Sequence, residues 1–250
     1  MEKKYILMSP HPDDTCFSLG GTILKNNVSV QFVNCDVFTK KKYNILHVPE
    51  DRAYNIIMDE EAQAVRKMNI ANIMLGYEDS YARSRGKLSN IFGREISEAE
   101  IIQETIYKEV KQSICRMINN LHPDAVFAPL GCGWHRDHLI VKKSIEECFK
   151  NKKGFALYFY EDMPYSANSS WLAKGLEDAC GRYILEEKIM KIDDVIEQKN
   201  ELLQIYKTQI KSRDIRMMNA YMRSIKEGFI CERFWKVKQE SNLVNSQELF

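Results

Sequence analysis

Residues 5–14 read YILMSPHPDD, a short apolar run that leads directly into a polar turn. The apolar run predicts a first β-strand, and the turn brings His11, Asp13 and Asp14 together as a candidate metal and acid–base cluster. Pro12 lacks a backbone N–H and biases His11 toward an extended backbone, so we expect a stiff turn. Adjacent aspartates tend to point in different directions, which allows one to bind a metal while the other faces a substrate. The alternative is that one of them only caps the following helix.

Outward from this turn, short apolar runs alternate with longer amphipathic segments. The expected strands lie at residues 5–8, 28–33, 72–75, 124–129 and 155–160. The expected helices lie near 14–26, from about 50 to 68, from a capping box at Ser97 to about Asn120, and at 139–149. Strands separated by helices predict an α/β fold, with a mostly parallel sheet that helices cover on both faces.

A second polar motif, GCGWHRDH at residues 131–138, directly follows the strand expected at 124–129. Its two histidines, His135 and His138, share a face if the segment is helical. Asp137 between them could orient a ring by accepting its second N–H, which is the usual arrangement around a metal-binding histidine. A lone histidine is more often structural, but two that flank an aspartate just beyond a strand favour a metal site.

The two motifs can meet in the folded chain because both follow predicted strands. In an open parallel sheet, ligands bind outside the carboxyl ends of the strands, where the loops converge. His11, Asp14 and His138 would then form a set of two histidines and one carboxylate, which leaves a fourth zinc position open for water. Asp13 and His135 remain as acid–base groups that bind no metal.

These motifs resemble those of the PIG-L/LmbE-like metal-dependent N-acetyl-sugar deacetylases, whose signatures are His-Pro-Asp-Asp and a later His-x-Asp-His. The likeness covers most of the chain. It also includes Gly20-Gly21, Leu75-Gly76 followed by Asp79, the glycines before His135, the segment YEDMPY at 160–165 and the segment 199–209.

The resemblance implies a Rossmann-like fold and one zinc ion per chain, or ferrous iron in its place, bound by the set of three ligands named above. It implies that Asp13 is the general base and that His135 stabilises the oxyanion, with Asp137 behind it to fix its tautomer and favour its charged form. Two positions depart from the family pattern. Thr15 stands where an acidic residue is usual, and the usual arginine falls near Ile57, where Arg52 or Arg66 could compensate.

Substrate contacts are expected mainly from the polar and aromatic segment 77–83, which is equally consistent with a solvated loop. Asp79 is the strongest candidate because it matches the family position, and Arg83 lies in the same segment. Glu161 and Tyr165 are further candidates from the YEDMPY segment.

The composition is that of a globular protein. The chain has 250 residues, of which 44% are hydrophobic and 28% charged, and we expect one domain over 1–250 with a helical extension over 210–250. In that extension, the apolar stripe that includes Met218 and Met222 is expected to be core, with a subunit interface or a lid as the alternative. The sequence therefore leaves open whether the protein forms a homo-oligomer.

The charge balance excludes some partners. Lys and Arg number 36 against 35 Asp and Glu, which leaves no basic excess to bind nucleic acid or an anionic membrane. No apolar run reaches the roughly 18 residues of a membrane-spanning helix, and the N-terminal apolar stretch is too short for a secretory signal. We therefore expect a cytoplasmic protein whose seven cysteines are free thiols.

The expected function is a hydrolase that removes the acetyl group from an N-acetylated amino sugar, such as a conjugate of N-acetylglucosamine. One alternative is a metal-dependent phosphoesterase, although a two-metal version needs more ligands than these motifs supply. Another is a member of the fold that binds a sugar without hydrolysing it, which the intact Asp13 and His135 argue against.

Overall fold

The computed structural model describes residues 2–41, 44–84, 95–151 and 154–240. Its strands form a seven-stranded sheet in the order β3-β2-β1-β4-β5-β7-β6. The strands are β1 Lys3–Ser9, β2 Val30–Asp36, β3 Ala71–Met74, β4 Ala125–Pro129, β5 Ala156–Tyr160, β6 Tyr183–Lys191 and β7 Cys231–Glu240. The strands β1 to β5 pair in parallel, whereas β7 pairs antiparallel with both β5 and β6. The predicted α/β fold with a mostly parallel sheet is therefore confirmed.

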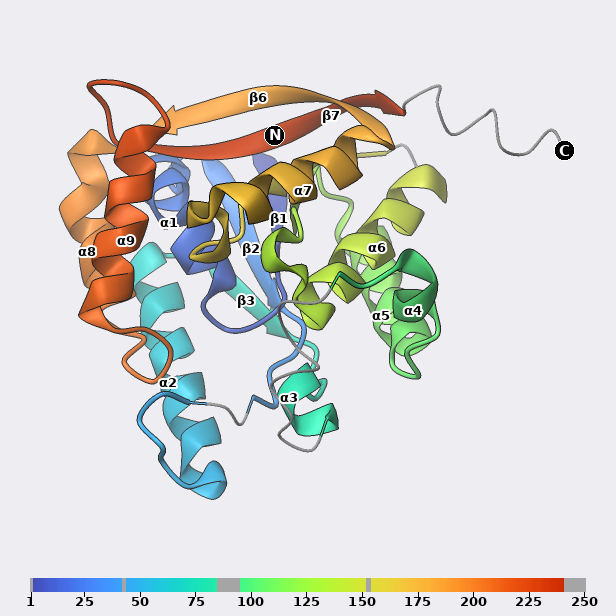
Figure 1. Ribbon diagram of the computed structural model, residues 1–250, viewed down its shortest axis with the longest axis horizontal. Helices are drawn as coiled ribbons and strands as arrows, with labels where there is room; N and C mark the ends of the chain where they lie inside the picture. The colour runs from blue at the N-terminus through green and yellow to red at the C-terminus, as the bar shows by residue number, and fades with distance from the viewer. Residues whose placement is uncertain (1, 42–43, 85–94, 152–153, 241–250) are drawn as a thin grey trace, which may run out of the picture.

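Helices cover both faces of the sheet (Figure 1). They are α1 Asp14–Asn26, α2 Glu50–Met68, α3 Ser80–Arg83, α4 Glu98–Ile102, α5 Tyr107–Leu121, α6 Arg136–Asn151, α7 Ser169–Cys180, α8 Ile196–Leu203 and α9 Ser212–Ser224. The capping box of Ser97 and Glu100 is present, but the long helix expected from it is divided into α4 and α5. In the described part of the chain, no helix combines the length and apolarity needed to cross a membrane.

The central strand β1 shows why the sheet needs cover on both sides. Ile6 and Met8 belong to a core cluster with residues of α5 and α6, while Leu7 belongs to a second cluster with residues of α1, α8 and α9. Since successive side chains of a strand point to opposite faces, a strand buried on both faces is apolar along its length. This pattern explains why β1 was predictable.

The segment 210–250 is not helical throughout, which corrects the prediction for this part of the chain. Helix α9 is present and its Met218 and Met222 are buried in the core. Strand β7 then follows, and residues 241–250 lie outside the described residues. In β7, the buried Phe234 and Val237 belong to different core clusters, Phe234 with residues of α1, α8 and α9 and Val237 with residues of α5 and α6. Charged residues are interspersed between the apolar ones, so the strand lacks a continuous apolar run.

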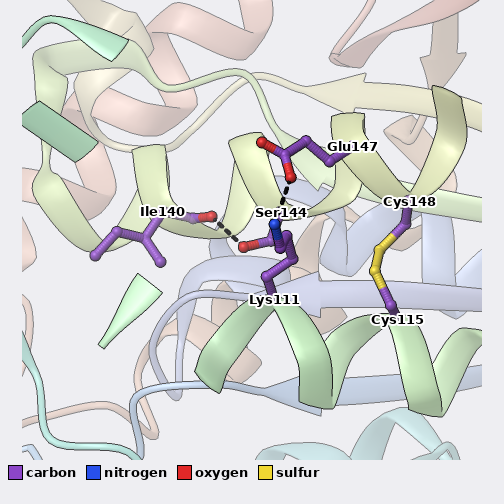
Figure 2. The surroundings of a disulfide bond; sticks show 6 residues. All are labelled: Lys111, Cys115, Ile140, Ser144, Glu147 and Cys148. Atoms are coloured by element: carbon purple, nitrogen blue, oxygen red, sulfur yellow. Dashed lines mark hydrogen bonds and ion pairs between the residues drawn. A yellow bond between two sulfur atoms is a disulfide. The ribbon is translucent and has the colours of Figure 1, made fainter. Parts of the chain in front are cut away.

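The prediction that all cysteines are free thiols is wrong for one pair. Figure 2 shows Cys115 of α5 joined to Cys148 of α6 by a disulfide, with a Cα–Cα distance of 5.7 Å. The same two helices are linked by the ion pair between Lys111 and Glu147 at 2.7 Å. No short cysteine motif signals this pairing, because packing of α5 on α6 brings together residues 33 positions apart. The other five cysteines are free.

Candidate metal centre

The two motifs meet at the carboxyl ends of β1 and β4. The ring centroid of His11 lies 4.7 Å from that of His135 and 5.4 Å from that of His138, and the latter two centroids are 5.0 Å apart. Nitrogen atoms of the three rings lie within 4.8 Å of one another, and all three side chains are buried. The parallel sheet thus brings the two loops together.

Hydrogen bonds set the orientation of two of these rings. Asp137 contacts Nε2 of His11 at 2.9 Å, and Asp162 contacts Nδ1 of His138 at 2.6 Å. Because a carboxylate accepts hydrogen bonds, each contacted nitrogen carries the proton in the neutral ring. The lone pairs of the opposite nitrogens, Nδ1 of His11 and Nε2 of His138, then both face Oδ2 of Asp14 at 3.3 Å.

This convergence of three lone pairs fits a cation. Nε2 of His138 is buried and has no hydrogen-bond partner among the described residues. Two neutral imidazoles and a carboxylate form a common ligand set for catalytic zinc. The carboxylate of Asp14 also accepts a hydrogen bond from the backbone N–H of His11 at 2.8 Å, which holds it in the turn.

The short distances between these groups shift the pKa values of His138 and Asp14. Burial alone would lower the pKa of His138, but Asp14 and Asp162 outweigh burial and raise this pKa to about 10. Burial would raise the pKa of Asp14, but His138 and His11 hold it well below its usual range. Protons bound by the histidine rings balance the negative charge of the carboxylates. A divalent cation can take the place of these protons.

His135 differs from the other two histidines in its electrostatics. Burial and the neighbouring rings of His11 and His138 lower its pKa well below the usual range, so its ring is neutral. Its Nδ1 accepts a hydrogen bond from the backbone N–H of Asp137 at 3.2 Å, which places the ring proton on Nε2. A protonated Nε2 donates a hydrogen bond, so His135 is suited to bind an oxygen rather than a metal.

Asp137 is placed differently from the expectation that its carboxylate lies behind His135 and favours the charged ring. Its carboxylate contacts His11, and it also accepts hydrogen bonds from Arg83 and from the backbone N–H of Ser80, each at 2.8 Å. Its contact with His135 is made by the backbone N–H. The reason is that Asp137 lies in the first turn of α6, where its side chain reaches across to the loop after β1.

Asp13 lies beside the three converging lone pairs and is strained. Its backbone φ is 124°, a value that residues with side chains rarely adopt and that is typical of functional sites. It occupies the N-cap position of α1 but makes no capping hydrogen bond with its side chain within the described part of the chain. Burial raises its pKa to about 6, although Lys41, at 3.0 Å from Oδ2, acts in the opposite direction.

The residues expected to bind substrate fall into two groups. Asp79 is buried and caps α3 by accepting from the N–H of Ala82 at 2.8 Å, and it interacts electrostatically with His11. The ring of Tyr165 lies 5.7 Å from that of His138. Both residues are therefore near the candidate metal centre. Arg83 is paired with Asp137.

The carboxylate of Glu161, a further candidate for substrate binding, is held by side chains of α9 and β7. Its carboxylate accepts hydrogen bonds from Arg233 at 2.6 Å, from Trp235 at 3.1 Å and from Tyr221. Arg233 and Trp235 belong to β7, a strand that was not predicted. The neighbouring Asp162 takes the place at the site, because successive residues after β5 point in opposite directions.

Asp162 and Lys41 are the two residues of the site that sequence reasoning missed. Asp162 also accepts hydrogen bonds from the backbone N–H groups of Gly131 and Cys132 at 2.8 and 3.0 Å, so it ties the second motif to the end of β5. The only available signal for it was its position in the YEDMPY segment, and Lys41 belongs to no motif.

The structure places the residues at the two departures from the family pattern inside the fold. Thr15 donates a hydrogen bond to Asn34 at 2.7 Å inside the fold. Ile57 is fully buried in the core, whereas Arg52 and Arg66 are exposed on α2.

Comparison with known proteins identifies the family. The model of the PIG-L family, described as GlcNAc-PI de-N-acetylase, matches residues 6–149. The chain is 24% identical over 218 residues to 2'-N-acetylparomamine deacetylase of Streptomyces fradiae, which covers 84% of this chain and 75% of that protein.

Solved structures share the fold. A deacetylase of the teicoplanin biosynthesis pathway has a TM-score of 0.80 at 18% identity, with 96% of this chain and 99% of that chain covered. N,N'-diacetylchitobiose deacetylase from Pyrococcus horikoshii has a TM-score of 0.67 at 18% identity, with 94% and 84% covered. Since the family model spans more than half of the sequence, the chain belongs to the PIG-L family of N-deacetylases, as its motifs predicted.

Proposed function

We propose that this chain is a zinc-dependent hydrolase that removes the acetyl group from an N-acetylated amino sugar or its glycoconjugate. The proposal depends on one observation, the convergence of lone pairs from His11, Asp14 and His138. The buried carboxylate of Asp13 interacts electrostatically with His11 and Asp14 of this set. The names of the relatives support the reaction class, because those proteins are deacetylases of 2'-N-acetylparomamine and of N,N'-diacetylchitobiose.

We assign His11, Asp14 and His138 as the metal ligands. A grouping of three histidines that includes His135 is geometrically compact, but the proton on Nε2 of His135 argues against its use as a ligand. A divalent ion held there would polarise the acetamide carbonyl and lower the pKa of a bound water toward about 7. Zinc is the first choice because two histidines and a carboxylate with an open position are typical of catalytic zinc, and ferrous iron accepts the same ligands.

Asp13 and His135 then perform the acid–base and stabilising roles. The Asp13 carboxylate takes a proton from the attacking water and passes it to the departing amide nitrogen. The water oxygen bonds to the carbonyl carbon, the C–N bond breaks, and the products are acetate and the free amine of the sugar. The Nε2–H group of His135 donates a hydrogen bond to the oxyanion. A hydrogen bond of this type stabilises the transition state by about 3 kcal/mol.

Residues around the site have supporting roles in this proposal. Asp137 fixes the ring of His11 with its carboxylate and the tautomer of His135 with its backbone N–H. Asp79 and Tyr165 are the proposed contacts for the sugar, because a carboxylate binds hydroxyl groups and an aromatic ring packs on a pyranose. Arg83 acts through its ion pair with Asp137.

A panel of substrates tests the proposal. The protein is loaded with zinc or with ferrous iron and incubated with N-acetylglucosamine, N,N'-diacetylchitobiose and 2'-N-acetylparomamine, with p-nitrophenyl phosphate as a phosphoester. We expect acetate and free amine in equal amounts from at least one amino sugar, and no activity in Asp13→Ala, which keeps its metal. Release of phosphate alone would favour a phosphoesterase, and sugar binding without acetate release would favour a non-catalytic member of the fold.

A further inference from the structure

We propose that Lys41 is a positioning residue that holds the carboxylate of Asp13 in the orientation from which it acts on the attacking water. This inference rests on the proposed function, in which Asp13 is the general base.

The contact between the two side chains is short and sheltered. Nζ of Lys41 lies 3.0 Å from Oδ2 of Asp13, and the two side chains are only 11% and 6% exposed. Asp14 and Asp79 also attract the ammonium group of Lys41. Such an ion pair is held more firmly than one on the open surface, where water and salt screen the charges.

The backbone that carries Lys41 is tied to the site on two sides. The N–H groups of Val37 and Phe38 donate to the carbonyls of Ser9 and Pro10 at 2.9 and 2.8 Å, which joins the segment after β2 to the turn that carries His11. The N–H of Lys40 donates to the carbonyl of Tyr77 at 3.0 Å, which joins it to the loop after β3. Lys41 therefore approaches Asp13 from a fixed position.

Asp13 needs such a restraint. Its backbone has a φ of 124°, and no hydrogen bond to the start of α1 holds its side chain within the described residues. The ion pair with Lys41 engages Oδ2 and so selects the rotamer. We therefore assign acceptance of the proton to Oδ1. A positioned base can contribute about 10²–10⁴-fold to the rate, and part of this factor depends on its orientation.

Steady-state kinetics of Lys41→Met and Lys41→Arg test the role. We expect kcat of Lys41→Met to fall at least about tenfold, with KM within twofold of the wild type and zinc content unchanged. Lys41→Arg should recover most of the loss, because a guanidinium also donates to a carboxylate. Lys40→Met is the matched control, since Lys40 is exposed on the same segment, and it should behave as the wild type.

The other outcomes would overturn the inference. Unchanged kcat in Lys41→Met would show that Asp13 needs no partner, a rise in KM alone would show a substrate contact, and loss of zinc or a lower Tm would show a structural role. If the wild type deacetylates nothing, the proposed function fails separately. Crystal structures of the wild type and Lys41→Met then still test the positioning role of Lys41. We expect the Asp13 carboxylate to change rotamer in the variant. A carboxylate that does not move would refute that role.

Discussion

Replacement of Asp162 by asparagine tests whether the carboxylate sets the tautomer of His138. In the wild type, Oδ1 of Asp162 contacts Nδ1 of His138 at 2.6 Å, while Oδ2 accepts from the backbone N–H groups of Gly131 and Cys132. In Asp162→Asn the amide oxygen can keep the two backbone donors, so the NH₂ group then faces His138. Nδ1 must accept a hydrogen bond from it, which moves the ring proton to Nε2.

The tautomer change removes one lone pair from the candidate metal centre. Loss of a carboxylate that supports a metal-binding histidine reduces metal affinity by about 10–100-fold, or about 1.4–2.8 kcal/mol. We expect a rise in the zinc Kd of this size, measured by competition with a chelator of known affinity. Asp59→Asn, on the exposed face of α2, is the control and should leave the Kd unchanged. An Asp162→Asn protein that binds zinc as tightly as the wild type would refute the argument.

Three further predictions concern the base, an ion pair and the disulfide. Asp13 accepts a proton only as a carboxylate, so kcat/KM should fall as the pH is lowered through its pKa. Burial raises that pKa to about 6 in the metal-free protein, and a bound divalent cation moves it to lower pH. A kcat/KM that rises toward low pH would exclude Asp13 as the base. Arg83→Met leaves the fully buried Asp137 without its cation, so the free energy of unfolding should fall by about 3–5 kcal/mol in urea titrations, and a change below about 1 kcal/mol would contradict a buried pair. Cys115→Ser removes the disulfide that closes a loop over 33 positions, so the free energy of unfolding should fall by about 3–4 kcal/mol. A reductant should lower the stability of the wild type by the same amount and leave that of Cys115→Ser unchanged.

The central part of the sheet could be predicted because its strands are buried on both faces. Such strands are continuous apolar runs, as in β1 and β4, and the helices between them have a clear period. Strands β6 and β7 could not be found in the same way. Along β6 buried and exposed residues are mixed and charged side chains are frequent, so its pattern resembles that of a surface segment.

The candidate site could be predicted as far as its two motifs extend. His11, Asp14 and His138 were named from their residue types and their places after strands. The partner of each ring could not be assigned, because it depends on how α6 and the end of β5 are oriented. Asp162 and Glu161 are neighbours in the sequence, and only the antiparallel strand β7, which binds Glu161 through Arg233, decides which of the two faces the metal centre.

Lys41 illustrates a different limit of sequence reasoning. A lysine in a connecting segment has no spacing to a motif and no periodic pattern. Its place beside Asp13 follows from backbone hydrogen bonds between the segments after β1 and β2, which form only in the folded sheet.

A crystal structure of the zinc-loaded protein, with anomalous diffraction recorded on both sides of the zinc edge, tests the central claim most directly. The account predicts one anomalous peak at about 2.0–2.2 Å from Nδ1 of His11, Oδ2 of Asp14 and Nε2 of His138, with His135 outside the coordination sphere. A peak bound by His135 in place of Asp14, or no peak between these three side chains, would contradict it.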